Sequence, residues 1–210
     1  MTRAGAQHKR GAEPAARRGR ELPQQVRIVG GLYKRSTLPV LDRPGLRPTP
    51  QRVRETLFNW LGQDLTGLTC LDLFAGSGVL GLEAASRGAQ LVVMVERDPI
   101  AFKALRENAN LLQASGVELV RTDALEFLTS DARVYDVVFL DPPYALSDRE
   151  PLLTRVRQRL APGAMVYSEW PGPANVGAAW EVVRDDRAGA VHYRLLRALP
   201  SEESGISRDL

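Results

Sequence analysis

The stretch that decides the fold is CLDLFAGSGVLG, residues 70–81. The apolar run at its start predicts a strand over Cys70–Phe74, and the following residues, Val79–Arg87, predict a helix. Gly76 and Gly78 permit a tight turn between the two, in which the backbone can approach a ligand closely. A strand, a glycine turn and a helix in this order are typical of a nucleotide-binding α/β unit.

Strands and helices continue to alternate from Leu68 onward, which predicts a doubly wound α/β fold with a mostly parallel, seven-stranded sheet. The predicted strands are 70–74, 91–95, 117–120, 134–140, 164–169, 180–186 and 191–199, and the predicted helices are 79–87, 99–113, 124–129 and 148–160. The last two strands should pair as an antiparallel hairpin around Ala188-Gly189-Ala190.

A small N-terminal extension is expected before the sheet. Residues 26–40 predict a short hairpin around Gly30-Gly31, and a helix should run from Thr49, as its cap, and Pro50 to about Leu61. The apolar residues of this helix should face the core: Val53, Leu57 and Leu61, flanked by Phe58 and Trp60. Its arginines, with the one before it, should face elsewhere: Arg47, Arg52 and Arg54.

The tetrapeptide Asp141-Pro142-Pro143-Tyr144 directly follows the predicted strand 134–140. Proline cannot donate to a sheet ladder, so the two prolines should end the strand and stiffen the loop. Loops at the carboxyl ends of parallel strands are where open α/β sheets hold ligands. An acidic acceptor, carbonyl oxygens and an aromatic ring together suit a planar group that bears an NH2.

The glycines also fit a dinucleotide fingerprint. Gly76, Gly78 and Gly81 match G-x-G-x-x-G, and Glu96 follows where a ribose-binding acid would stand, so a nicotinamide dehydrogenase has to be considered. Asp72 argues against it, because a carboxylate beside the glycine turn would repel a pyrophosphate. It would instead attract the ammonium and sulfonium charges of S-adenosylmethionine.

Taken together, these residues resemble the class I methyltransferases that modify exocyclic amines and have a Rossmann-like sheet. Two further stretches, VRIVGG (26–31) and PGLRPTPQRVRETLFNWL (44–61), are similar to the RsmD family, and the resemblance covers roughly residues 26–197. That family methylates the 2-amino group of one guanine, conventionally number 966, in 16S ribosomal RNA. The resemblance therefore implies this reaction, with S-adenosylmethionine as cofactor and the small subunit as partner.

The resemblance also implies roles for individual residues. The cofactor loop is Leu71–Gly78, Glu96 is the ribose carboxylate, Asp123 is the acid near adenine, and the segment 47–49 closes over the methionine end. The full set of expected cofactor-binding residues is Thr49, Asp72, Phe74, Ala75, Gly76, Gly78, Glu96, Arg97, Asp123, Ala124 and Asp141. The expected catalytic residues are Asp141, Pro142, Pro143 and Tyr144. In that set Asp141 and the Pro142 carbonyl accept the amine hydrogens, and Tyr144 stacks on the purine.

Charge is spread unevenly along the chain. Residues 1–58 hold 13 Lys or Arg against 4 Asp or Glu, a net of +9, whereas residues 59–210 hold 15 against 21, a net of −6. A basic arm on a mildly acidic body indicates a nucleic-acid partner. The expected RNA-binding residues are Arg27, Tyr33, Lys34, Arg35, Arg47 and Arg52.

These observations predict four segments: a basic disordered tail (1–25), the hairpin and helix as an RNA-binding extension (26–64), the methyltransferase domain (65–200) and a disordered tail (201–210). Cys70 is the single cysteine and is expected in the core rather than in a disulfide. The two histidines are too few for a metal site, and no apolar run is long enough to span a membrane. A cytoplasmic monomer without metal is therefore expected.

Two alternatives stay open from sequence. The wider class contains DNA adenine-N6 and protein glutamine-N5 methyltransferases, and a non-catalytic RNA-binding module could keep the fold. The 66 residues after Tyr144 are nearly all needed to complete the sheet, which leaves no domain to read a DNA sequence. Protein-amide enzymes favour asparagine where this chain has Asp141. RNA with a base already displayed in a loop is therefore the favoured substrate.

Overall fold

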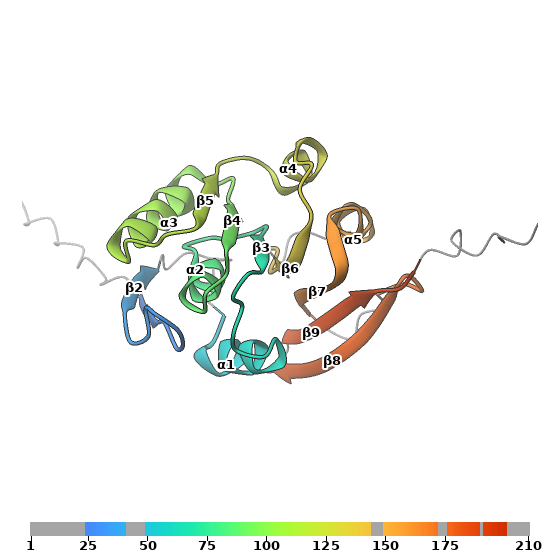
Figure 1. Cartoon of the computed structure of the whole chain (residues 1–210), viewed down its shortest axis with the longest axis horizontal. Coiled ribbons are helices and arrows are strands. Elements are labelled where there is room, and N and C mark those ends of the chain that lie inside the picture. The colour runs from blue at the N-terminus through green and yellow to red at the C-terminus, as the bar shows by residue number, and fades with distance from the viewer. Residues whose placement is uncertain (1–23, 41–48, 144–148, 172–175, 190, 201–210) are drawn as a thin grey trace, which may run out of the picture.

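A seven-stranded sheet forms the centre of the computed structural model, which describes residues 24–40, 49–143, 149–171, 176–189 and 191–200 (Figure 1). The strands are β3 (Thr69–Asp72), β4 (Leu91–Val95), β5 (Val117–Val120), β6 (Tyr135–Leu140), β7 (Leu160–Pro171), β8 (Trp180–Ala188) and β9 (Val191–Ala198). Their order across the sheet is β5-β4-β3-β6-β7-β9-β8. Strands β3 to β7 pair in parallel, and β9 is antiparallel to both of its neighbours. The predicted doubly wound, mostly parallel sheet with a closing hairpin is confirmed.

Helices cover both faces of this sheet (Figure 1). One face carries α1 (Gln51–Trp60), α2 (Val79–Ser86) and α3 (Pro99–Leu111), and the other carries α4 (Ala124–Ser130) and α5 (Glu150–Arg157). Successive strand residues point to opposite faces, so Cys70 and Phe139 pack on the α1 side, whereas Leu71 and Leu140 pack on the α5 side. This alternation decides which strand-end side chains can meet.

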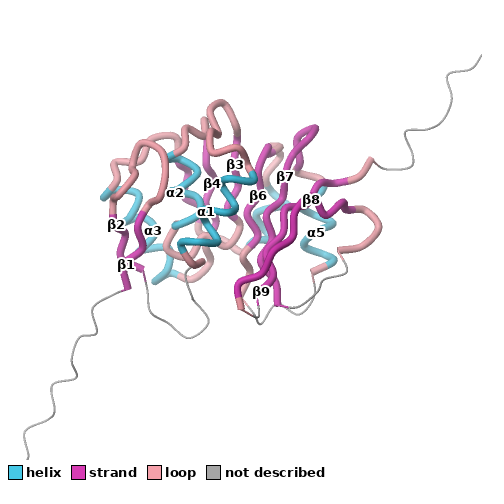
Figure 2. Tube along the Cα trace, turned by 90° about the horizontal axis from the view of Figure 1, so that it is seen from below, coloured by secondary structure: helices cyan, strands magenta, loops and turns pink. Residues whose placement is uncertain are grey.

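The N-terminal hairpin pairs β1 (Gln24–Arg27) with β2 (Thr37–Val40) as a separate two-stranded sheet. Viewed from below, it lies at the α3 end of the molecule, and the long β8–β9 hairpin lies at the other end (Figure 2). It begins two residues before the predicted start. Its turn is tied to the body because the Leu32 amide donates to the carbonyl of Ser86 at 2.6 Å.

A buried ion cluster joins this extension to the body. The Glu83 carboxylate accepts from the amides of Val29 (2.9 Å) and Gly30 (2.8 Å), and from Arg54 Nη1 (3.3 Å) and Arg87 Nε (3.0 Å). Arg54 is 1% exposed, so the expectation that it faces away from the core is wrong. Helix α2 is apolar on all sides around Glu83, and a buried carboxylate of this kind requires cationic and amide partners.

The start of α1 also differs from the prediction. Pro50 is the residue before the helix, and no side chain caps its first turn. The Thr49 hydroxyl instead donates to Asp141 Oδ2 at 3.3 Å. A tertiary partner has therefore taken the hydroxyl that local sequence rules assign to the helix end. At the other end, Trp60 stacks on Tyr193 of β9 with ring centroids 5.4 Å apart.

The lengths of one strand and one helix also differ from the prediction. Strand β7 begins at Leu160, four residues before the prediction, because Leu160 already pairs with Tyr135 before a register shift. Helix α5 is correspondingly shorter than predicted. Cys70 is a free, buried cysteine as expected, and burial raises the pKa of its thiol to about 12.

None of the helices in the described ranges has the length and apolar character needed to cross a membrane. Within the same ranges, no group of three or more histidine, cysteine, aspartate or glutamate side chains is arranged to hold a metal ion.

Candidate active site

The site lies at the point where the order of the strands in the sheet reverses. Strands β3 and β6 are neighbours, but the chain runs from β3 outward to β4 and β5 before it returns to β6. Ligands of open α/β sheets bind beyond the carboxyl ends of the strands at such a point. Asp72 ends β3 in register with Phe139 of β6, and Asp141 directly follows the end of β6, so it lies beside the glycine turn. The structure thus brings the two predicted motifs to one edge of the sheet.

The glycine turn after β3 is held by side chains from two other elements. Gly76 has φ 55° and Gly78 has φ 87°, values that favour glycine. The Gly76 amide donates to Glu96 Oε2 at 2.9 Å, and the Asn108 side chain donates to the Ser77 carbonyl at 2.8 Å. The turn is therefore fixed by its neighbours before any ligand is bound.

The third and second glycines of the motif serve helix packing. A Cβ on Gly81 would lie 2.5 Å from Met94 Sδ, and a Cβ on Gly78 would lie 2.3 Å from Leu105 Cδ1. Close helix–strand packing is the ordinary role of the third glycine. For Gly78 the clash is with a side chain of α3, so a larger residue there would also disturb the packing of α3.

The predicted cofactor acids follow β4 and β5. Glu96 Oε1 also accepts from the Asp98 amide at 2.7 Å, which aims the carboxylate across the turn. Asp123 accepts from the Leu125 amide at 2.9 Å as the N-cap of α4, and its Oδ2 lies 3.5 Å from Nη1 of Arg97. Two residues predicted to bind cofactor therefore contact each other across the ends of β4 and β5.

The remaining predicted cofactor residues lie on the same edge. Phe74 and Ala75 follow β3, with Phe74 partly buried and Ala75 buried, and Ala124 is buried at the start of α4. The Ala75 amide donates to the Val95 carbonyl at 2.9 Å. This bond joins the ends of β3 and β4, beside which these predicted cofactor residues lie.

Three carboxylates form an acidic cluster at this edge: Asp72, Asp141 and Glu169. Asp141 shares the face of Phe139, and Glu169 shares the face of Tyr167, because each lies two residues further along its strand. The Tyr167 hydroxyl donates to Glu169 Oε1 at 2.7 Å, and Thr49 donates to Asp141. In the described part of the chain, no lysine, arginine or histidine forms an ion pair with any of the three.

Burial is the largest cause of a raised pKa in all three acids. Burial is the largest cause for Asp141, whose pKa lies well above its usual value, and the charges of Glu169 and Asp72 add to it. Burial likewise raises the pKa of Glu169. Burial raises the pKa of Asp72 to about 7, against the opposing effect of the Gly81 amide, which donates to Asp72 at 3.0 Å. A positively charged ligand would relieve all three.

The arrangement fits S-adenosylmethionine better than a dinucleotide. Asp72 Oδ1 is buried and has no hydrogen-bond partner among the described residues. An ammonium group would satisfy this oxygen, whereas a pyrophosphate at the same turn would meet uncompensated negative charge. The two Glu96 oxygens accept from the Gly76 and Asp98 amides. The carboxylate can still accept hydrogen bonds from ribose hydroxyls, since each of its oxygens has two lone pairs.

Sequence reasoning missed Glu169 and Asn108. Glu169 stands near the end of an apolar strand, and Asn108 is 1% exposed within α3. In both cases the hydrophobic periodicity of the element assigns the position to the core, and a polar residue at such a position could have indicated a functional or structural role. Asn108 donates to the carbonyls of Ser77 and Pro39, at 2.8 and 3.1 Å, so it links the glycine turn to the N-terminal hairpin.

The expected RNA-binding residues fall into three groups. Arg27, Lys34, Arg35 and Arg52 are exposed. Tyr33 is half-buried, packs against the core and accepts from the Ser115 amide at 3.4 Å, so its ring is engaged in packing rather than presented for stacking. Arg47 lies outside the described residues, as does the catalytic candidate Tyr144. Pro142 is buried and Pro143 is exposed directly after β6.

Comparisons with known proteins agree with this geometry. The family model described as conserved hypothetical protein 95 matches residues 26–197. The chain is 40% identical to ribosomal RNA small subunit methyltransferase D of Escherichia coli strain K12 over 185 residues, which cover 86% of this chain and 93% of that protein. The solved structure of the yhhF protein from Escherichia coli superposes with a TM-score of 0.74 at 38% identity, covering 83% of this chain and 98% of that one. An RNA methyltransferase from Salinibacter ruber, solved in complex with S-adenosyl-L-homocysteine, gives a TM-score of 0.60 at 26% identity and covers 78% and 99% of the two chains.

Proposed function

Because the chain belongs to the RsmD family of methyltransferases, we propose that it methylates the 2-amino group of a guanine in 16S ribosomal RNA, at position 966, and does so in the cytoplasm on the assembled small subunit. S-adenosylmethionine is its methyl donor. The observation that supports the proposal most is the position of Asp141. This acid and the two prolines after it stand at the end of β6, across the sheet's switch point from the glycine turn.

The proposed chemistry starts from the weak nucleophilicity of the guanine amine, whose lone pair is delocalised into the ring. Asp141 and the carbonyl of Pro142 accept the two N–H hydrogens and draw the nitrogen toward a tetrahedral shape. Tyr144 stacks on the purine and aligns it. Most of the acceleration then comes from holding the two reactants in line, for which ~7–11 kcal/mol is available in good cases.

The protonation state of Asp141 is part of this proposal. The bound cofactor supplies a methyl group on a positively charged sulfonium, and a nearby positive charge favours the ionised form of an acid. Thr49 holds one Asp141 oxygen at 3.3 Å, so the other oxygen is left for the amine. After transfer the extra proton leaves the nitrogen, and Asp141 need not be a strong base.

RNA specificity in this proposal comes from the basic N-terminal segment. Residues 1–58 carry a net +9 while the body carries −6, so phosphate contacts should concentrate on the extension that packs against α2 and α3. A preformed RNA shape would present the base, as in much of sequence-specific RNA recognition. This reasoning favours the assembled subunit over free ribosomal RNA.

The test is to offer radiolabelled S-adenosylmethionine with four substrates at matched salt: small subunits that lack the modification, free 16S ribosomal RNA, duplex DNA and a peptide release factor. Label at N2 of guanine, with small subunits methylated fastest, is the expected result. Label only in DNA adenine or in a glutamine amide would replace the proposal with one of those alternatives. Binding of RNA without any transfer would instead indicate a non-catalytic module.

A further inference from the structure

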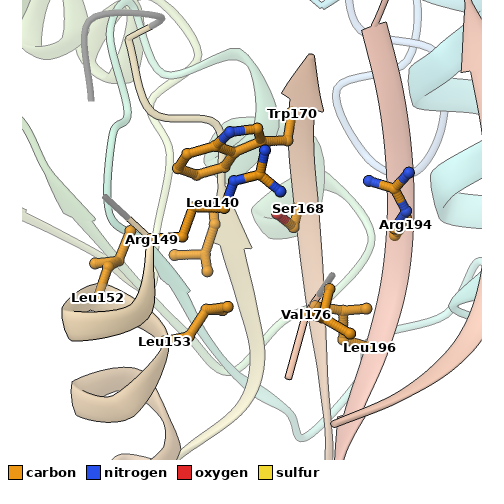
Figure 3. Close-up of a pocket in the computed structure, with 9 residues that line it drawn as sticks. All are labelled: Leu140, Arg149, Leu152, Leu153, Ser168, Trp170, Val176, Arg194 and Leu196. Carbon is orange, nitrogen blue, oxygen red and sulfur yellow. The ribbon is translucent and has the colours of Figure 1, made fainter. Parts of the chain in front are cut away.

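A small pocket lies near the carboxyl ends of β6 and β7, on the face of the sheet opposite to the acidic cluster. It is formed between α5, β7 and β9 and is lined in part by Leu140, Arg149, Ser168, Trp170 and Arg194 (Figure 3). Leu140 directly precedes Asp141, and Ser168 and Trp170 flank Glu169 in the chain. Because side chains alternate along a strand, this pocket opens on the α5 side while the acidic cluster lies on the α1 side.

Two arginines converge on this pocket. The Arg149 guanidinium carbon lies over the Trp170 ring, 3.9 Å from the ring centroid. Arg194 is only 4% exposed and is the cross-strand partner of Ser168, so the two side chains share one face of the sheet. In Figure 3, Ser168 lies between the two guanidinium groups.

The two arginines differ in their partners. Arg194 Nε lies 3.2 Å from Asp185 Oδ1, but Arg149 forms no ion pair with any described residue. Burial lowers the pKa of Arg149, and the positive charge of Arg194 lowers it further. Two like charges directed at one partly buried space favour an anion between them. Residues 59–210 carry a net negative charge, so the two arginines form a positively charged spot on a negatively charged body.

We propose that Arg149, Arg194 and Ser168 bind a phosphodiester group of the RNA strand, next to the nucleotide whose base enters the Asp141 site. The proposal rests on the function proposed above and adds a second contact on the far side of the strand ends. Guanidinium forks match phosphate oxygens in a bidentate manner, and the Ser168 hydroxyl can donate a third hydrogen bond. The RNA strand would thus cross the sheet edge at the carboxyl ends of β6 and β7, with a base on one side of the sheet and a phosphate on the other.

The cofactor is a poor candidate for this pocket. Its carboxylate would have to reach from the rim formed by β3, β4 and β5, whereas the arginines lie beyond β6 on β9 and at the start of α5. The basic N-terminal hairpin is also distant, at the α3 end of the molecule (Figure 2). The pocket therefore forms a separate contact, between the reaction centre and the β8–β9 hairpin.

The test replaces Arg149 with methionine, which keeps an unbranched apolar stem against Trp170 and removes the charge. Arg155→Met, on an exposed position of the same helix, is the matched control. Binding to unmodified small subunits is measured over a range of salt. We expect Arg149→Met to bind about 5- to 20-fold more weakly and to lower the salt slope by about 0.7, the value for one neutralised phosphate on a single strand. Cofactor affinity and thermal stability should match those of Arg155→Met, and Arg149→Lys should recover most of the binding.

The outcomes separate this proposal from the function on which it rests. Methylation of small subunits by the unchanged protein is measured in the same samples, and its absence would overturn the proposed function. Normal methylation, with an unchanged affinity and salt slope for Arg149→Met, would overturn the phosphate contact alone. If inorganic phosphate stabilises the unchanged protein but not Arg149→Met, while subunit binding is equal, the pocket holds free phosphate and the RNA contact is wrong.

Discussion

Two clusters of charged side chains in this molecule differ in whether opposite charges meet within them. The cluster around Glu83, called the balanced cluster below because opposite charges meet in it, brings two arginines and two backbone amides to one carboxylate, and Arg54 Nε is its buried nitrogen without a hydrogen-bond partner among the described residues. The cluster of Asp72, Asp141 and Glu169 has raised pKa values and no cationic partner in the described part of the chain. A cluster in which opposite charges meet needs no ligand and holds elements together. An unbalanced one costs stability and is completed by a ligand.

The largest expected effect removes the centre of the unbalanced cluster. Asp141→Ala should lower turnover by a factor of about 10² to 10⁴, which is typical of a positioned catalytic group. Cofactor affinity should stay within a few-fold, and the folded protein should lose no stability because one of three like charges is gone. Methyl transfer, calorimetric cofactor titration and urea unfolding measure the three quantities. Asp141→Asn, which keeps an acceptor oxygen, should retain more activity than the alanine variant.

Breaking the balanced cluster should affect stability instead. Glu83→Gln leaves Arg54 and Arg87 buried without a carboxylate, and loss of one partner of a buried ion pair costs about 3–5 kcal/mol. Urea unfolding of this variant beside Glu107→Gln, an exposed glutamate on α3, checks the prediction. A loss under 1 kcal/mol would mean that the extension is not held by this contact.

Much of this comparison could be predicted from sequence, and the missing part has a physical cause. The apolar runs and the glycine turn predicted all seven sheet strands, and the strand ends gave the edge on which the motifs lie. The partners of Arg54 and Glu169 could not be predicted, because ion pairs and like-charge contacts join elements far apart in the chain. Thr49 was misassigned for the same reason: a helix cap is a local rule, and Asp141 is 92 residues away.

The free energy of unfolding should depend on pH because of the raised pKa values in the unbalanced cluster. Burial raises the pKa of Asp72 from 3.8 to about 7, so the folded protein binds this proton more tightly than the unfolded chain does. The stabilising contribution is complete below about pH 4 and is lost as pH rises toward 7. The free energy of unfolding without cofactor should therefore fall across this window by at most about 4 kcal/mol more than in Asp72→Asn. Equal pH profiles for the two proteins would contradict the raised pKa.

Cofactor affinity should depend on the same acid. Asp72→Asn keeps the shape but removes the charge offered to the ammonium group, and hydrogen bonds to charged groups contribute about 1.5–3 kcal/mol, so affinity should fall about 10- to 100-fold. Glu83→Gln is the control and should bind normally when folded. Calorimetry should show no NAD binding by any of the three proteins. NAD binding without a response to S-adenosylmethionine would reverse the assignment of the glycine turn.

The smallest effect concerns the surface of the extension. Replacing Arg35, Arg47 and Arg52 together with alanine should weaken RNA binding and lower its salt slope by about 2, if each contacts one phosphate. Cofactor affinity should not change. The same change at Lys103, Arg106 and Arg155, which are exposed elsewhere, should leave the slope nearly unaltered. Removal of residues 1–20 should do less than the first triple variant.

We infer that the unbalanced cluster takes part in methyl transfer, whereas the balanced cluster around Glu83 holds the N-terminal extension to the body. The most direct test compares single-turnover methyl transfer to unmodified small subunits by Asp141→Ala and Glu83→Gln, at saturating S-adenosylmethionine and at a temperature where circular dichroism shows both folded. We expect a rate reduced by about 10² or more for Asp141→Ala and a rate within a few-fold of the unchanged protein for Glu83→Gln. A near-normal rate for Asp141→Ala, or an equally large loss for folded Glu83→Gln, would contradict this inference.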